Sequence, residues 1–253
     1  MTAKKTILLI LFLIVGFLFI NHLYQIVFKK PVFARIIFFG DSITQAGVKR
    51  NGYVTIVANT LKQEYPNHNL EVIGAGISGN KVTDLQARLQ KDVLAKNPTH
   101  VVIYIGINDV WHFYAFDNVT GTDAKVFEQG LRDMIQQIRD SGAEVSLCTP
   151  SVIGEKPDSK AEVNQLLKKY ADISRNVAKT SGVHLCDLRI AFEEYLRTNN
   201  KKMSYQGILT SDGVHLNDQG NRFVADVILK HLRPLLTERE KLEQQKNLED
   251  SGI

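Results

Sequence analysis

The chain has 253 residues, of which 44% are hydrophobic and 23% charged, and its formal net charge is +4. This composition is sufficient for a sizeable core and excludes a disordered or collagen-like chain. Lysine and arginine are interspersed with acidic residues rather than clustered, so we expect no nucleic-acid partner.

The first thirty residues form a separate segment. Lys4 and Lys5 precede an apolar run at 7–20, and a weaker apolar stretch continues to residue 28. Taken to residue 28, the segment is about long enough to cross the roughly 30 Å core of a bilayer, whereas the run at 7–20 resembles the core of a signal peptide. The one small-residue cleavage motif ends at Ala34, directly before a predicted strand. An uncleaved anchor is therefore favoured over a secreted or periplasmic product.

A short basic amino terminus ahead of a long chain typically stays in the cytoplasm. We therefore expect membrane contact through residues 7–28, with the main domain outside the cytoplasm. The predicted organisation is a signal-anchor or transmembrane segment at 1–30, one folded domain at 31–236 and a charged tail at 237–253. We interpret the tail as a solvated helical extension.

Strands and helices alternate through the folded domain. The strands are short and rich in Val, Ile, Leu and Phe, as expected for strands buried on both faces of a parallel sheet. In chain order the predicted elements are strand 35–39, helix 53–64, strand 70–73, helix 82–94, strand 100–105, helix 124–141, strand 144–148, helix 161–180, strand 183–186, helix 190–199 and helix 217–232. Five β-α units in series predict a doubly wound α/β sandwich rather than an eight-stranded barrel.

Two cysteines, Cys148 and Cys186, both fall in predicted strands. Two are too few for a disulfide scaffold or a structural zinc site. Two buried free thiols are the simpler interpretation, and a single bridge between neighbouring strands stays open.

Four polar, glycine-containing loops follow the predicted strands. They carry Gly-Asp-Ser-Ile-Thr at 40–44, Gly-Ile-Ser-Gly-Asn at 76–80, Gly-Ile-Asn-Asp at 106–109 and Ser-Asp-Gly-Val-His at 211–215. Each motif alone is typical of an ordinary turn, helix cap or surface pair. Because ligand sites of such sheets lie at the carboxyl ends of the strands, the four loops together indicate one site.

The residue types in these loops fit acyl transfer. A serine hydroxyl needs an adjacent general base, which His215 can supply to Ser42. A carboxylate, here Asp212, must hold the imidazole in the correct tautomer. An oxyanion needs fixed donors, for which the backbone N–H groups of Ser42 and Gly79 and the side-chain amide of Asn108 are the candidates.

These motifs resemble the SGNH, or GDSL-type, hydrolase family of esterases and lipases. The resemblance rests on GDSIT at 40–44, ISGN at 77–80, GIND at 106–109 and DGVH at 212–215, and extends over residues 36–231. It implies a flavodoxin-like three-layer α/β/α sandwich with a five-stranded parallel sheet, preceded here by an N-terminal hydrophobic helix.

The family's namesake residues carry over to Ser42, Gly79, Asn108 and His215, with Asp212 as the third triad member. The resemblance further implies an acyl-serine intermediate, no metal and no organic cofactor.

The sequence departs from the family pattern at two positions. Gly74 replaces a frequent asparagine, which we expect to loosen a turn without affecting the chemistry, and Asn80 stands where aspartate is frequent. We interpret Asp41 and Asp109 as residues that hold loops rather than carry protons. The G-x-S-x-G elbow of α/β-hydrolases is absent around Ser42, which argues against that fold.

Substrate contacts are expected from the aromatic segment that follows Asn108. Trp111, His112 and Tyr114 are candidates for a wall that stacks on a sugar or lines a short acyl pocket, although covering the core edge would explain them equally well. The loop at 149–160 reaches the same rim. The absence of a long apolar lid argues against a triglyceride lipase.

The sequence therefore predicts a serine esterase that removes small acyl groups, most simply acetyl from carbohydrate. A lysophospholipase or thioesterase acting on lipid esters is the alternative, and a non-catalytic membrane-tethered binding module is a second. A phosphate or nucleotide binder is disfavoured because no Walker motif occurs and because such a binder would not explain Asp212 and His215. The seven histidines show no metal-ligand spacing. The sequence leaves the oligomeric state open.

Overall fold

Five parallel strands form one sheet in the computed structural model, which describes residues 14–16, 32–115, 120–157 and 161–250. The strand order is β2-β1-β3-β4-β5, which is the order of flavodoxin-like folds. The strands are β1 (Ala34–Gly40), β2 (Leu70–Gly76), β3 (His100–Tyr104), β4 (Glu144–Cys148) and β5 (His184–Cys186). The central strand β3 is buried along its whole length. The predicted α/β sandwich with a five-stranded parallel sheet is confirmed.

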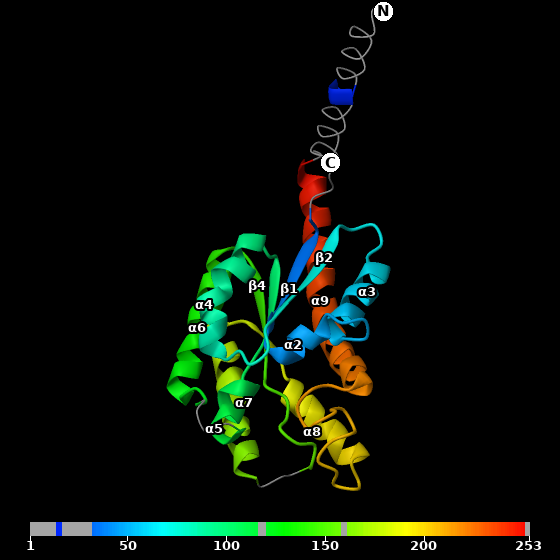
Figure 1. Ribbon diagram of the computed structural model, residues 1–253. Helices are drawn as coiled ribbons and strands as arrows, with labels where there is room; N and C mark the ends of the chain where they lie inside the picture. Colours follow the sequence, from blue (N-terminus) through cyan, green and yellow to red (C-terminus); the bar gives the residue numbers. More distant parts are fainter. Residues whose placement is uncertain (1–13, 17–31, 116–119, 158–160, 251–253) are drawn as a thin grey trace, which may run out of the picture.

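Helices cover both faces of the sheet (Figure 1). On one face α4 (Val82–Asp92), α6 (Ala124–Asp140) and α7 (Glu162–Ser181) pack side by side, and on the other α3 (Tyr53–Glu64) packs against α9 (Asp218–Asp250). Apolar residues three or four positions apart create the buried stripe of each helix, which in α6 consists of Phe127, Leu131, Met134, Ile135 and Ile138. The remaining helices are α2 (Ser42–Gly47), the 3₁₀ turn η1 (Leu94–Lys96), α5 (Ile107–Ala115) and α8 (Leu188–Asn199).

Strand β2 continues three residues beyond its predicted end. Gly74, Ala75 and Gly76 lie opposite Phe38, Phe39 and Gly40 of β1. Glycine and alanine have little intrinsic strand preference, so the ladder with β1 extends the strand where propensity would end it. Gly74, which we expected in a turn, therefore lies within the sheet.

Helix α9 does not end near residue 232 as predicted. It runs to Asp250 with Pro234 inside it, so the expected helical tail is continuous with the last helix of the domain. The first turns beyond Pro234 pack on the domain rather than facing only solvent. Arg239 Nε donates to the carbonyl of Phe33 at 2.5 Å, and Glu240 lies 3.5 Å from His68 Nε2.

The predicted N-terminal hydrophobic helix lies outside the described residues, apart from residues 14–16, which are helical. Within the described ranges, no helix is both long and apolar enough to cross a membrane. At the start of the domain, Phe33 is 3% exposed, and its ring lies 5.7 Å from Tyr65 and 4.3 Å from His68 between centroids. The core therefore begins before β1.

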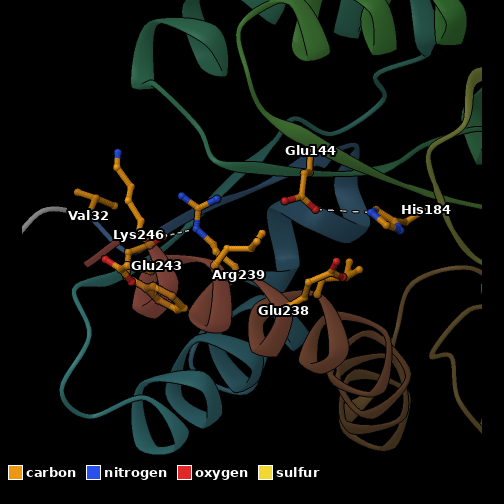
Figure 2. Close-up of a pocket in the computed structure, with 10 residues that line it drawn as sticks. Val32, Glu144, His184, Glu238, Arg239, Glu243 and Lys246 are labelled. Carbon is orange, nitrogen blue, oxygen red and sulfur yellow. Dashed lines mark hydrogen bonds and ion pairs between the residues drawn. The ribbon is translucent and has the colours of Figure 1, made fainter. Parts of the chain in front are cut away.

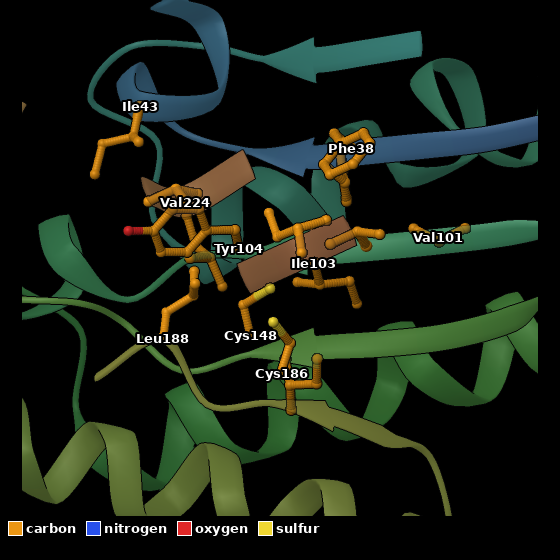
Figure 3. Close-up of a cluster of buried hydrophobic side chains, with 14 of the residues drawn as sticks. Phe38, Ile43, Val101, Ile103, Tyr104, Cys148, Cys186, Leu188 and Val224 are labelled. Atoms are coloured by element: carbon orange, nitrogen blue, oxygen red, sulfur yellow. The ribbon is translucent and has the colours of Figure 1, made fainter. Parts of the chain in front are cut away.

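Cys148 and Cys186 are buried free thiols on neighbouring strands. They lie opposite each other in the ladder between β4 and β5, and Figure 3 shows their sulfur atoms pointing toward one another within the core. The hydrogen bond with Cys186 and burial raise the pKa of the Cys148 thiol well above its ordinary value. Of the two interpretations open at the level of sequence, the free thiols are the one observed.

A polar cluster links β3, β4 and α9 on the α9 face of the sheet. The hydroxyl of Ser146 lies 2.8 Å from His100 Nε2 and 2.7 Å from His231 Nε2. A hydroxyl has a single proton, so it can donate to only one of these rings. Burial lowers the pKa of His231 to about 4 and also lowers that of His100.

This cluster makes stability depend on pH. His231 binds its proton at about pH 4 in the folded chain but at about 6.5 when unfolded, so the unfolded state binds more protons between these values. The contribution of His231 is fully present above about pH 6.5 and is lost as the pH falls toward 4, by roughly 2–3 kcal/mol. Urea unfolding at pH 7.0, 5.5 and 4.5 should show a smaller decline for His231→Gln than for the parent protein. If the free energy of unfolding declined equally with falling pH in both proteins, the contribution assigned to His231 would be contradicted, since all other titrating groups are common to both.

Candidate active site

Ser42 is held at the carboxyl end of β1 by the turn into α2. The strand ends at Gly40, and Asp41 caps the helix, its Oδ1 accepting from the N–H of Ile43 at 2.9 Å. Ser42 is then the first residue of α2, partly exposed. A side-chain oxygen at this capping position satisfies one of the free N–H groups of the helix start, which fixes the direction in which Ser42 points.

The structure brings the three residues predicted for the triad together. Ser42 Oγ lies 2.9 Å from His215 Nε2, and His215 Nδ1 lies 2.6 Å from Asp212 Oδ2. Ser42 follows β1, whereas Asp212 and His215 lie in the loop before α9, so the contact joins residues 173 positions apart. The arrangement has the connectivity of a nucleophile, a general base and an orienting carboxylate.

Asp212 is fixed by its own loop. Its Oδ1 accepts from the N–H groups of Val214 at 2.9 Å and His215 at 2.7 Å, leaving Oδ2 for the imidazole. Partial burial favours the protonated acid, but the hydrogen bonds from the His215 side chain and from the two N–H groups outweigh it and lower the pKa of Asp212 below its ordinary value. Asp212 is therefore ionised at neutral pH and can stabilise a charged imidazolium.

Two further carboxyl groups beside the site are buried. Asp41 is 2% exposed and Asp109 is fully buried. Burial raises the pKa of Asp41 to about 7 and that of Asp109 to about 6. Each holds a loop, Asp41 by capping α2 and Asp109 by accepting from the N–H of Val82 at 3.0 Å. These contacts agree with the interpretation of both as loop-holding residues.

The three candidate oxyanion donors lie on neighbouring loops. Asn108 is 5% exposed, and its Nδ2 donates to the carbonyl of Asn80 at 3.0 Å, which ties α5 to the turn that carries Gly79. An amide nitrogen has two protons, so one is left for a ligand. Among the described residues, no acceptor is paired with the backbone N–H of Ser42 or Gly79. Each of the three groups therefore has a proton that no described acceptor takes.

Arg88 of α4 fastens these loops together and was not predicted as a site residue. Its guanidinium donates to the carbonyl of Gly40 at 2.7 Å, the carbonyl of Ala75 at 2.9 Å and Oδ1 of Asn80 at 2.7 Å. The same group lies 4.5 Å from the ring centroid of Phe39. One side chain thus connects the ends of β1 and β2 to the Gly79 turn.

Glu155 supports the loop that carries Asp212 and His215, and it was also not predicted. It is fully buried in the loop after β4. Its carboxylate accepts three backbone N–H groups, from Ile208 at 2.8 Å, Leu209 at 2.5 Å and Thr210 at 2.6 Å. One buried side chain therefore pairs three consecutive N–H groups of the segment directly before the catalytic loop.

The aromatic residues predicted for substrate contact lie in different surroundings. The ring of Trp111 lies 6.3 Å from that of His215, at the site. Tyr114 is 45% exposed on the same helix, whereas His112 is 8% exposed, which leaves little of its ring for a ligand. Tyr205, which was not predicted, is 48% exposed and packs beside the catalytic loop. A Cβ on Gly154 or Gly213 would come within 2.5 or 2.4 Å of its ring, so only glycine fits beneath it.

One cavity lies away from this site. It has a volume of about 510 Å³ and is lined by Phe33, Glu144 and His184 with residues of α9 from Leu235 to Lys246 (Figure 2). Glu144 and His184 are the first residues of β4 and β5. The cavity therefore lies at the amino ends of the strands, opposite the triad.

Comparison with known proteins supports the assignment made from geometry. The GDSL-like Lipase/Acylhydrolase family matches residues 38–223. An acetylxylan esterase of Geobacillus stearothermophilus is 31% identical over 212 residues, covering 78% of this chain and 93% of that protein. An isoamyl acetate-hydrolyzing esterase 1 homolog of Rattus norvegicus is 27% identical over 227 residues, covering 81% and 82%.

Solved structures agree with the sequence relatives. The crystal structure of an acetyl xylan esterase superposes with a TM-score of 0.74 at 47% identity, covering 78% of this chain and 98% of the other. The solved acetylxylan esterase Axe2 of Geobacillus stearothermophilus gives a TM-score of 0.71 at 29% identity, covering 81% and 96%. The chain thus belongs to the GDSL-like Lipase/Acylhydrolase family and is a carboxylic ester hydrolase.

Proposed function

We propose that this hydrolase removes acetyl groups from carbohydrate through an acyl intermediate on Ser42. The observation that carries the mechanism is the continuous chain of contacts from Ser42 Oγ to His215 and on to Asp212, at 2.9 and 2.6 Å. The acetylated carbohydrate is supported by the acetylxylan esterases among its relatives. Lipid acyl esters are the competing substrate class.

In the acylation step, Ser42 Oγ attacks the ester carbonyl carbon while His215 Nε2 takes the hydroxyl proton. The carbonyl oxygen becomes an oxyanion, which the N–H groups of Ser42 and Gly79 and the amide of Asn108 stabilise. Losing one such donor typically slows acyl transfer about 10²–10³-fold. The tetrahedral species then collapses, and His215 returns the proton to the leaving alcohol of the sugar.

Deacylation repeats the same steps with water as the nucleophile. His215 removes a proton from water, the hydroxide oxygen attacks the acyl-serine carbonyl, and the proton returns to Ser42 Oγ as acetic acid leaves. In both steps His215 is transiently charged, and the ionised Asp212 stabilises that charge. Asp212 itself does not accept the proton.

Two aromatic rings at the rim suit a sugar better than a long acyl chain. Trp111 lies beside His215, and Tyr205 presents its outer face next to the same loop. Flat aromatic faces can pack against the C–H faces of pyranose rings, with the phenol and indole N–H available for hydroxyl groups. Both rings therefore adjoin the loop that carries the general base.

The decisive test is hydrolysis of p-nitrophenyl esters from acetyl to palmitoyl, together with acetyl release from an acetylated xylo-oligosaccharide. We expect the highest kcat/KM with acetyl and a loss of about 10⁴-fold or more in kcat for Ser42→Ala. Ser181→Ala, at the carboxyl end of α7, is the matched control and should retain full activity. A fluorophosphonate probe should label the parent protein and not Ser42→Ala.

Each alternative predicts a different result. A maximum at long acyl chains would assign the enzyme to lipid esters. A folded protein that hydrolyses no ester and is not labelled would contradict an activated serine and favour a tethered binding module.

A second prediction concerns Glu155, whose carboxylate accepts three N–H groups. In Glu155→Gln the side chain has one acceptor oxygen and one NH₂ group, so at least one buried N–H loses its acceptor. We expect a loss of about 1–3 kcal/mol in the free energy of unfolding. Displacement of the His215 loop should lower kcat about 10- to 100-fold with little change in KM.

Glu194→Gln, an exposed substitution on α8, is the control for this variant and should match the parent protein. Urea unfolding and steady-state kinetics at a temperature where both variants are folded separate the two effects. A Glu155→Gln enzyme with parental kcat would show that this carboxylate does not position the loop.

We further propose that residues 7–28 anchor the chain in a membrane with the catalytic domain outside the cytoplasm. The packing of Phe33 on Tyr65 and His68 supports an uncleaved segment, because a cut after Ala34 would remove a buried ring. The full chain, expressed in a bacterium, should sediment with membranes, resist extraction by salt and be digested by external protease in spheroplasts. A soluble product whose mass corresponds to a chain beginning at Arg35 would contradict the anchor.

A further inference from the structure

A second pocket lies between the loop after β4 and helices α7 and α8. Its volume is about 400 Å³, within the range that accommodates a small ligand. Both the loop after β4 and α8 follow the carboxyl ends of strands, so the pocket is at the same end of the sheet as the triad. Polar and charged side chains dominate its lining, which includes Lys156, Asn164, Gln165, Lys168, Arg189, Glu193 and Arg197.

The pocket carries an excess of positive charge. Four cationic side chains and one carboxylate line it, an excess of three positive charges. Within the described ranges, Lys156, Lys168 and Arg197 form no ion pair, whereas Arg189 lies 2.8 Å from Glu193. One carboxylate therefore faces four cations, and the pocket favours a second anion.

Arg189 forms the floor of the pocket and is 4% exposed. Its guanidinium donates to the carbonyl of Ser151 at 3.2 Å and to Oδ1 of Asn164 at 3.4 Å, both long contacts. Burial disfavours the charged form and lowers the pKa of Arg189. A negative group placed beside it would offset that cost, and a planar guanidinium suits a carboxylate or phosphate.

The pocket is directly connected to the catalytic loop. Gly154, which lines the pocket, donates its N–H to the carbonyl of Gly213 at 2.8 Å. Gly213 lies between Asp212 and His215 in sequence, and the ring of Tyr205 covers both glycines. The pocket and the catalytic loop are therefore adjacent, joined by one backbone hydrogen bond and covered by one ring.

From these contacts we propose that the pocket is a subsite for an anionic sugar unit of the substrate, one or more residues away from the acetylated sugar. This inference rests on the proposed action on carbohydrate. The anion is held by Arg189 with Lys156, Lys168 and Arg197, and the amides of Asn164 and Gln165 bind hydroxyl groups. A carboxylate of a uronic acid and a phosphate ester both supply the required chemistry.

Binding to the full-length Ser42→Ala protein tests the subsite without relying on turnover. The probes are a xylo-oligosaccharide bearing one uronic acid, the same oligosaccharide bearing one phosphate monoester, and the neutral parent, each measured by calorimetry. In this background, the double variant Lys168→Gln/Arg197→Gln should raise the Kd for an anionic probe about three- to tenfold and leave the neutral probe unchanged. This difference in Kd between the double variant and its Ser42→Ala background should largely disappear at 0.5 M NaCl because salt screens exposed charges.

The matched control is Lys169→Gln/Lys201→Gln, which removes the same charge from α7 and the loop after α8 outside the pocket. The subsite is supported if the control has the Kd values of the Ser42→Ala parent while the pocket variant binds an anionic probe more weakly. The probe whose binding is weakened shows whether the pocket takes a uronic acid or a phosphate ester. Equal weakening by both double variants, or of the neutral probe, would overturn it.

The proposed function is tested separately. If the active protein releases acetyl from neutral oligosaccharides while the anionic probes bind no differently from the neutral one, the subsite fails and the esterase assignment stands.

Discussion

The parallel register of β1 with β2 and β3 is the constraint on which the site depends. Gly40 lies opposite Gly76 and Tyr104, so three strands end level and their loops meet. A slip in this ladder would separate the Ser42 loop from the Gly79 turn and from Asn108. Arg88 reinforces the register from outside the ladder, since its guanidinium donates to carbonyl groups near the ends of β1 and β2 and to Asn80 in the turn that follows β2.

The third part of the site has no strand to position it. Asp212 and His215 lie on a loop outside the sheet. The buried carboxylate of Glu155 holds the segment before this loop by accepting three consecutive backbone N–H groups. A charge without a cationic partner is costly to bury unless hydrogen bonds satisfy it. Three backbone donors and complete exclusion from solvent make Glu155 a rigid support for the general base.

Much of this arrangement could be predicted from sequence because it depends on local patterns. Short β-branched runs indicate the strands, and Ser42 follows the first of them, where parallel topology gathers the loops. Asp212 and His215 could be identified from their Asp-x-x-His spacing before the last helix. Arg88 and Glu155 escaped prediction for one physical reason. A charged residue on a polar helix face or in a lysine-containing loop has the same sequence signature whether it is solvated or buried among carbonyl and N–H groups. The extension of β2 through Gly74 and the passage of α9 through Pro234 likewise depend on partners distant in sequence.

The two ends of the sheet have different neighbours. The chain enters the domain at Val32 and Phe33, beside the cavity at the amino ends of the strands, whereas the triad opens at the carboxyl ends. In the proposed anchored arrangement, the catalytic edge would be carried away from the lipid surface by the length of the domain. A 33-residue α9 spans roughly 50 Å, and Arg239, in its second half, contacts Phe33 at the point of entry. An enzyme mounted in the proposed orientation would face away from the bilayer, so a glycan outside the membrane would be nearer to the triad than a membrane lipid.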